Sequence, residues 1–128
     1  MRELIEKALE ARKKAYAPYS KFKVGAAVLT KDGKIYTGCN VENASYPVGI
    51  CAERVAMSKA VADGERNFTA VAIVGSGDVH CTPCGMCRQF LSEFCKGDLK
   101  VISAKSPDDY KIFLLSELLP HTFDRDSL

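Results

Sequence analysis

The chain has 128 residues, 47% of them hydrophobic and 27% charged. Since domains commonly hold roughly 150 residues, we expect a single folded domain over residues 1–128. The net charge is +2, with both signs scattered along the chain, so we expect no nucleic acid partner. No apolar run approaches the roughly 18 residues of a membrane span, and the N-terminus lacks a signal-peptide core, so we expect no membrane association and a cytoplasmic location.

Apolar spacing predicts alternating helices and strands. In chain order, we expect a helix over 2–16, strands over 24–30 and 35–39, a helix over 51–62, a strand over 69–74, a helix over 83–97, strands over 99–103 and 110–115, and a helical turn over 116–119. Pro18 and Asp63-Gly64 are typical helix ends. Asp32-Gly33 is typical of a β-hairpin turn, so the first two strands should be antiparallel. This order predicts an α/β fold, a mixed sheet covered by helices.

Cysteine placement gives the first indication of chemistry. Six cysteines are many for a reducing compartment, where Cys serves packing, metal binding or catalysis. Cys84 and Cys87 stand three residues apart, so at the start of a helix both sulfurs face the same side. Cys51 starts another predicted helix. If the two helix starts adjoin, three thiolates can bind one zinc ion.

A zinc site with three protein ligands keeps a position open for catalysis, whereas a structural site closes it with a fourth ligand. Four residues are candidates for that fourth ligand: Cys39, His80, Cys81 and Cys95. A redox role for the Cys-x-x-Cys pair is a third alternative. Spacing alone leaves all three open.

Glu53, two residues after Cys51, favours a catalytic site. A carboxylate beside the open zinc position can act as general acid and base, as the non-ligand Glu of zinc deaminases does. Without Cys51 it would be an ordinary first-turn acid. Three thiolates need charge compensation, which Arg54 or Arg88 could supply by donating hydrogen bonds to sulfur. For Arg54 a surface position is equally open. We expect Arg88 at the surface.

Five motifs follow one another along nearly the whole chain. They are Phe22-Lys23-Val24-Gly25-Ala26-Ala27, Asn40-Val41-Glu42-Asn43-Ala44, Cys51-Ala52-Glu53-Arg54, Pro83-Cys84-Gly85-Met86-Cys87-Arg88-Gln89, and Leu118-Leu119-Pro120 with Phe123. These motifs resemble those of the short, homotetrameric class of cytidine deaminases. The resemblance implies a three-layer α/β/α sandwich with a mixed five-stranded sheet. It also implies hydrolysis of free cytidine and deoxycytidine to uridine and deoxyuridine with release of ammonia, as in pyrimidine salvage.

The same resemblance implies the roles of the metal site. Cys51, Cys84 and Cys87 would bind one Zn²⁺ per subunit, Glu53 would carry protons, and Arg54 would support the sulfurs.

At the sugar end of the substrate, the resemblance implies that Asn40 and Glu42 hold the ribose 3′-hydroxyl, with Val41 between them, and that Phe22 packs against the nucleoside. A carboxylate at the 3′-hydroxyl would repel a 3′-phosphate, so we expect free nucleosides rather than nucleic acid as substrates.

At the base end, the resemblance implies that the N–H of Ala52 meets the base and the carbonyl of Thr82 receives the departing amine. Tyr46 and Phe123 would reach into a neighbouring subunit's site, so that the sites of a homotetramer are shared. Cys81 departs from the family pattern, and we expect it to remain a free thiol.

Two other functions stay open. A related deaminase could act on a cytosine nucleoside antibiotic of the blasticidin S type, with the same metal site and another sugar pocket. A non-catalytic structural zinc module would explain the thiolates but would give Glu53 no role.

Overall fold

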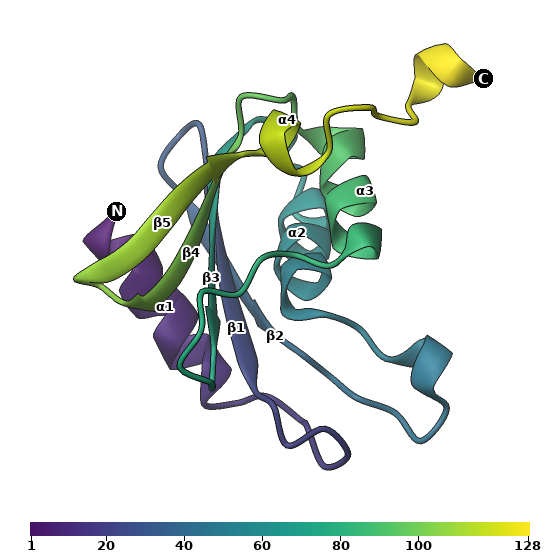
Figure 1. The fold of residues 1–128 in the computed structure, drawn as a ribbon. Helices are drawn as coiled ribbons and strands as arrows, with labels where there is room; N and C mark the ends of the chain where they lie inside the picture. Colours follow the sequence, from purple (N-terminus) through teal and green to yellow (C-terminus); the bar gives the residue numbers. More distant parts are fainter.

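Five strands form one mixed sheet in the order β2-β1-β3-β4-β5 in a computed structural model that describes residues 1–128 (Figure 1). The strands are β1 (Val24–Thr30), β2 (Ile35–Cys39), β3 (Phe68–Gly75), β4 (Lys100–Ser106) and β5 (Asp109–Leu114). β3 and β4 are parallel, and the other neighbouring pairs are antiparallel. The predicted mixed sheet, including its β1-β2 hairpin, is confirmed.

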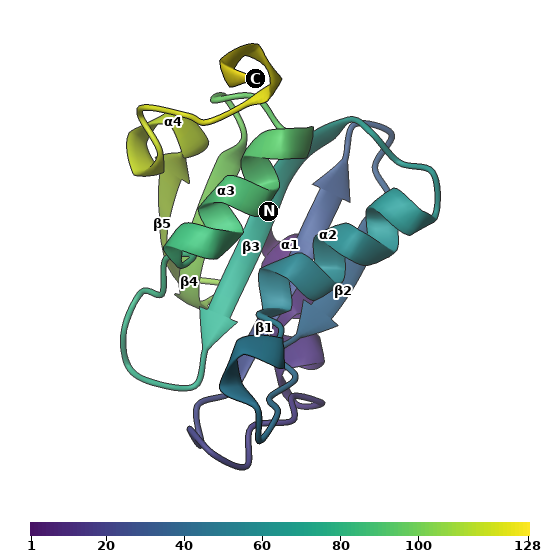
Figure 2. The same ribbon diagram turned by 90° about the vertical axis from the view of Figure 1, so that its right-hand side faces the viewer.

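Helices cover both faces of the sheet. They are α1 (Arg2–Arg12), α2 (Ala52–Ala62), α3 (Gly85–Phe94) and a short α4 (Leu115–Leu118). Figures 1 and 2 show α1 on one face and α2 and α3 side by side on the other, which confirms the predicted three layers. Two 3₁₀ turns, Tyr46–Val48 and Arg125–Ser127, were not predicted. None of the helices combines the length and the apolar character needed to cross a membrane.

The central strand β3 is buried on both faces, which explains its continuous apolar run. Val71 and Ile73 pack with α2 and α3, whereas Ala72 and Val74 pack with α1. Successive side chains of a strand point to opposite faces, so one strand supplies both cores. The sheet thereby fixes the positions of α2 and α3 on the same face.

The ends of two helices test the predictions made from the local sequence, and one of the two predictions is wrong. α1 ends at Arg12, four residues before the predicted end, because Tyr16 forms a bridge with Val41 instead of continuing the helix. The predicted left-handed cap of α2 is confirmed: Gly64 has φ +95°, and the N–H of Glu65 donates to the carbonyl of Ala60 at 3.0 Å.

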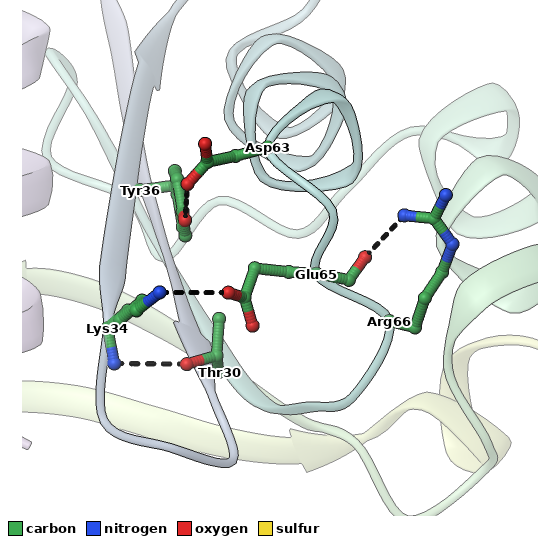
Figure 3. A network of polar contacts seen from close by, with 6 residues as sticks. All are labelled: Thr30, Lys34, Tyr36, Asp63, Glu65 and Arg66. Carbon is green, nitrogen blue, oxygen red and sulfur yellow. Dashed lines mark hydrogen bonds and ion pairs between the residues drawn. The ribbon is translucent and has the colours of Figure 1, made fainter.

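A polar network ties the end of α2 to the β1-β2 hairpin (Figure 3). The Tyr36 hydroxyl donates to the Asp63 carboxylate, and Lys34 Nζ lies 3.3 Å from Glu65 Oε2. The N–H of Lys34 donates to Thr30 Oγ1 at 3.0 Å. The C-terminal end of α2 is therefore held against the hairpin, and Cys51 is the N-cap at its other end.

Candidate active site

The N-termini of α2 and α3 bring three sulfurs together. Cys51 is the N-cap of α2, Cys84 is the N-cap of α3, and Cys87 lies in the first turn of α3. All three Sγ atoms lie within 4.8 Å of one another. Free backbone N–H groups at helix N-termini favour thiolates over thiols. The cysteines that the sequence pointed to as ligands therefore converge.

Contacts within the cluster favour the thiolate form of Cys51. Hydrogen bonding from Cys87, and then from Arg54, lowers the pKa of the Cys51 thiol to about 5 despite its partial burial. The bond to Cys51, together with burial, raises the pKa of Cys87. Arg54 Nη2 donates to the carbonyl of Gly49 at 3.2 Å, whereas its buried Nε has no hydrogen-bond partner. Because the half-buried guanidinium of Arg54 also hydrogen-bonds Cys51 and Cys87, it is suited to offset negative charge on the sulfurs.

This donor set fits a zinc ion with an open position. Zinc prefers thiolate and imidazole ligands in tetrahedral sites, and the cluster contains three sulfurs and no fourth Cys, His, Asp or Glu. Of the candidates for a fourth ligand, His80 is paired with Asp109 (Nε2–Oδ1 2.9 Å), and Cys81 lies outside the cluster. The arrangement of these side chains thus does not support the closed structural site.

Glu53 lies at the wall of a hollow of about 300 Å³. Its side chain is almost fully buried, with 5% of the residue exposed, and burial raises the pKa of its carboxyl group to about 7. The same hollow is lined by Cys51 and Cys84. A carboxyl group in such a place can accept and return protons near neutral pH.

Four of the predicted substrate residues line this hollow: Phe22, Asn40, Ala52 and Thr82. Ser20, Val24, Ile73 and Cys81 also line it and were not predicted as site residues. Val24 and Ile73 lie in strands whose apolar pattern gave no indication of which residues meet a cavity. Ser20 precedes Phe22 by two residues, and only the motif at 22–27 could have drawn attention to it.

Asn40 and Glu42 form hydrogen bonds within their own chain. Asn40 accepts from the N–H of Val24 and donates to the carbonyl of Phe22, both at 2.9 Å. The Glu42 carboxylate accepts from the N–H groups of Tyr19 (3.0 Å) and Ser20 (3.1 Å) and from the Ser20 hydroxyl. The bond from the Ser20 hydroxyl lowers the pKa of Glu42. A charged carboxylate retains capacity for a further donor, so the ribose contact stays a prediction.

The remaining predicted residues lie outside the hollow. Val41, Glu42 and Tyr46 line an adjoining hollow of about 310 Å³, which shares Asn40, Cys51 and Cys84 with the first. Phe123 lies on the C-terminal tail, 59% exposed, and its carbonyl accepts from Gln89 Nε2 at 2.7 Å. Figure 1 shows this tail running beyond α4 to the C-terminus. Phe123 lines neither hollow, so its contact with a neighbouring subunit also stays a prediction.

Arg88 is half-buried, so its expected surface position is wrong. Its Nε donates to the carbonyl of Pro83 at 2.7 Å, and its Nη1 donates to the carbonyl of Leu118 at 2.8 Å. The side chain therefore joins the start of α3 to the last residue of α4.

Comparisons with known proteins agree with this geometry. The family model described as "Cytidine and deoxycytidylate deaminase zinc-binding region" matches residues 1–103. A cytidine deaminase of Sporosarcina psychrophila is 46% identical over 126 residues, which cover 98% of this chain and 93% of that protein. Among solved structures, a cytidine deaminase from Burkholderia pseudomallei superposes with a TM-score of 0.90 at 50% identity, over 94% of this chain and 97% of that one. A cytidine deaminase from Mycobacterium tuberculosis gives a TM-score of 0.84 at 38% identity, over 94% of each chain.

Proposed function

The chain belongs to the family of cytidine and deoxycytidylate deaminases, and we propose that it hydrolyses free cytidine and deoxycytidine. In this reaction water replaces the amino group at C4, so that cytidine and water give uridine and ammonia. The enzyme would thereby serve pyrimidine salvage in the cytoplasm. No finding favours the antibiotic deaminase or the non-catalytic zinc module over this function.

One observation carries the proposal: a nearly buried carboxylate, Glu53, lines the same hollow as two of three clustered sulfurs. Cys51, Cys84 and Cys87 would hold one zinc ion per chain. When bound, zinc lowers the pKa of a water molecule at its open position and so supplies the nucleophile. Arg54 would offset the charge of the three thiolates, which its contacts with Cys51 and Cys87 support.

Glu53 would perform every proton transfer. Its carboxylate takes a proton from the attacking water and delivers it to N3 of cytosine, which makes C4 more electrophilic. The carboxylate then takes the proton of the hydroxyl added at C4 and passes it to the amino group, which leaves as ammonia. A pKa near 7, raised by burial, matches a group that must both accept and donate.

The other residues of the hollow would hold the nucleoside. Phe22 would pack against it, and Asn40 supports this arrangement because it accepts from Val24 and donates to Phe22. The N–H of Ala52 would meet the base, and the Thr82 carbonyl would accept from the amino group. Glu42, with Val41 beside it, would hold the 3′-hydroxyl and exclude a 3′-phosphate by charge repulsion.

The resemblance also supports a homotetramer with shared sites. Four large apolar side chains are exposed beside the adjoining hollow: Tyr46, Val48, Ile50 and Met86. An exposed apolar patch at the border of a site is typical of an interface. Tyr46 and Phe123 of one subunit would complete the pocket of another.

The test is an ammonia-release assay on cytidine and deoxycytidine, with the zinc content of the same protein sample measured. We expect turnover of both nucleosides by a zinc-containing protein. Blasticidin S serves as the comparison substrate. Turnover of the antibiotic alone would overturn the proposal, and so would a zinc-loaded protein that releases ammonia from none of the three.

A further inference from the structure

The segment that leads from β3 into α3 carries the Thr82 carbonyl. In this segment, residues 81–84, nearly every carbonyl oxygen has a donor within the chain. The Cys81 carbonyl accepts from the Ser103 hydroxyl, the Pro83 carbonyl accepts from Arg88 Nε at 2.7 Å, and the Cys84 carbonyl accepts from the N–H of Arg88 at 2.9 Å. Only the Thr82 carbonyl is left without one.

A carbonyl that has no donor inside the chain can accept a hydrogen bond from a donor outside it. Most backbone carbonyls of folded proteins are paired, so a carbonyl at a cavity that has no donor in its own chain is available to a ligand donor. Thr82 lines the hollow of Glu53. Within residues 81–84, the Thr82 carbonyl is therefore the one that remains free to accept from a ligand in the hollow.

Ser103 holds the segment from the sheet side. The residue lies in β4, is fully buried and has the Cys81 carbonyl as its hydrogen-bond acceptor. Because Thr82 precedes a proline, its backbone is restricted to extended conformations, in which successive carbonyls point to opposite sides. Fixing the Cys81 carbonyl on Ser103 therefore directs the Thr82 carbonyl away from Ser103.

Arg88 holds the same segment from the helix side. Its Nε binds the Pro83 carbonyl, and its Nη2 lies 3.3 Å from Thr82 Oγ1. A guanidinium donates several hydrogen bonds in a fixed planar arrangement, so it restrains two neighbouring residues at once. With Ser103, it fixes the residues on both sides of the Thr82 carbonyl.

We infer that Ser103 and Arg88 are positioning residues that aim the Thr82 carbonyl at the amino group of the substrate, an inference that rests on the proposed function. They set specificity for an amino group at C4. Cytidine presents a donor to this carbonyl, whereas uridine presents a carbonyl oxygen at the same place and is repelled. If the Thr82 carbonyl is no longer held in this orientation, cytidine binds more weakly, whereas uridine binds equally well or more tightly.

The test measures binding of both nucleosides by calorimetry in full-length protein carrying Glu53→Gln, which prevents turnover. In this background, Ser103→Ala and Arg88→Met should each weaken cytidine binding about tenfold, the value of one hydrogen bond, without weakening uridine binding. Ser103→Thr keeps the hydroxyl and should restore the selectivity.

Matched controls remove equivalent bonds elsewhere. Ser92→Ala removes a hydroxyl bond to the Gln89 carbonyl, and Arg66→Met removes guanidinium bonds to the Val61 and Glu65 carbonyls. Both should leave the selectivity intact. Circular dichroism checks folding, and Arg88→Met carries the test if Ser103→Ala does not fold.

Equal weakening of cytidine and uridine, or no change in either, would overturn the inference and show a merely structural role. Such a result leaves the proposed function standing if the wild-type protein releases ammonia from cytidine. If the wild type is inactive and Glu53→Gln binds neither nucleoside, the proposed function fails and takes the inference with it.

Discussion

The Sγ atoms of Cys51 and Cys84 lie 3.9 Å apart, although 33 positions separate the two residues in the sequence. Each residue caps a helix, and both helices lie on the same face of the sheet. The fold therefore brings two helix N-termini together, where their free N–H groups favour negative charge on sulfur. This relationship is the structural basis of the proposed metal site.

Removal of one ligand sulfur should remove the metal. We expect Cys84→Ser to lose zinc, because a serine hydroxyl does not replace a thiolate ligand. Elemental analysis of the purified protein measures the zinc content. Cys81→Ser is the matched control and should keep its zinc. Zinc loss in that control would make Cys81 a ligand and reinstate the closed structural site.

Gly38 allows α2 to lie close to β2. A Cβ atom built on this residue would lie 2.5 Å from the Ala56 nitrogen and 2.7 Å from the Ala52 oxygen, both of which are backbone atoms of α2. Backbone atoms give way poorly, so we expect Gly38→Ala to destabilise the protein by about 3 kcal/mol. Urea unfolding measures the change.

Gly85→Ala is the control for this substitution, because its Cβ meets nothing within 4 Å. It should change the free energy of unfolding by no more than about 1 kcal/mol. Equal effects of the two substitutions would show that close packing of α2 on β2 does not limit stability.

The Tyr36–Asp63 contact in Figure 3 predicts a pH dependence of stability. The hydrogen bond to Asp63, followed by burial and the Asp63 charge, raises the pKa of Tyr36 from 10.0 to about 12. Because the folded pKa lies above the unfolded one, the stabilisation is fully present below pH 10.0 and is lost as pH rises toward about 12. We expect Asp63→Asn to lose less stability than the wild type over this interval, as measured by urea unfolding at a series of pH values. If the free energy of unfolding falls equally with pH in both proteins, the Tyr36–Asp63 contact does not cause the pH dependence.

Much of the fold could be predicted because the spacing of apolar residues shows which side of each helix or strand is buried. The helical spacing of apolar residues predicted α2, and the continuous apolar run of β3 predicted a buried strand. Both elements are present in the structure. The end of α1 could not be found in this way. Tyr16 and its neighbours carry a helical pattern, but pairing of Tyr16 with Val41, distant in sequence, prevails over it.

The site could be predicted only where residue type specifies chemistry. Three cysteines and Glu53 indicated metal binding and proton transfer, although their spacing alone also allowed a structural zinc site or a redox pair. Ser103 gave no such indication, since serine in a strand is ordinary, and Arg88 was expected at the surface. Their importance depends on the partners they meet in space: Ser103 is 22 positions from Cys81, and Arg88 is 30 positions from Leu118.

The proposed sharing of sites between subunits predicts complementation. We expect Phe123→Ala to fold, since the side chain is 59% exposed, but to lose activity because neighbouring pockets are incomplete. Subunits with Glu53→Gln keep Phe123, so mixing the two inactive variants should restore part of the cytidine turnover. The oligomeric state is checked by light scattering. Full activity of a monomeric protein that lacks the tail from Phe123 onward would contradict shared sites.

The most direct measurement of the central claim is the rate of ammonia release from cytidine by Glu53→Gln. Glutamine has nearly the same shape as glutamate but cannot shuttle protons, so we expect the variant to keep its zinc and its fold while the rate falls by about three orders of magnitude or more. Glu93→Gln, a matched change at an exposed position of α3, should keep the wild-type rate. A wild-type rate in zinc-loaded Glu53→Gln would contradict the account.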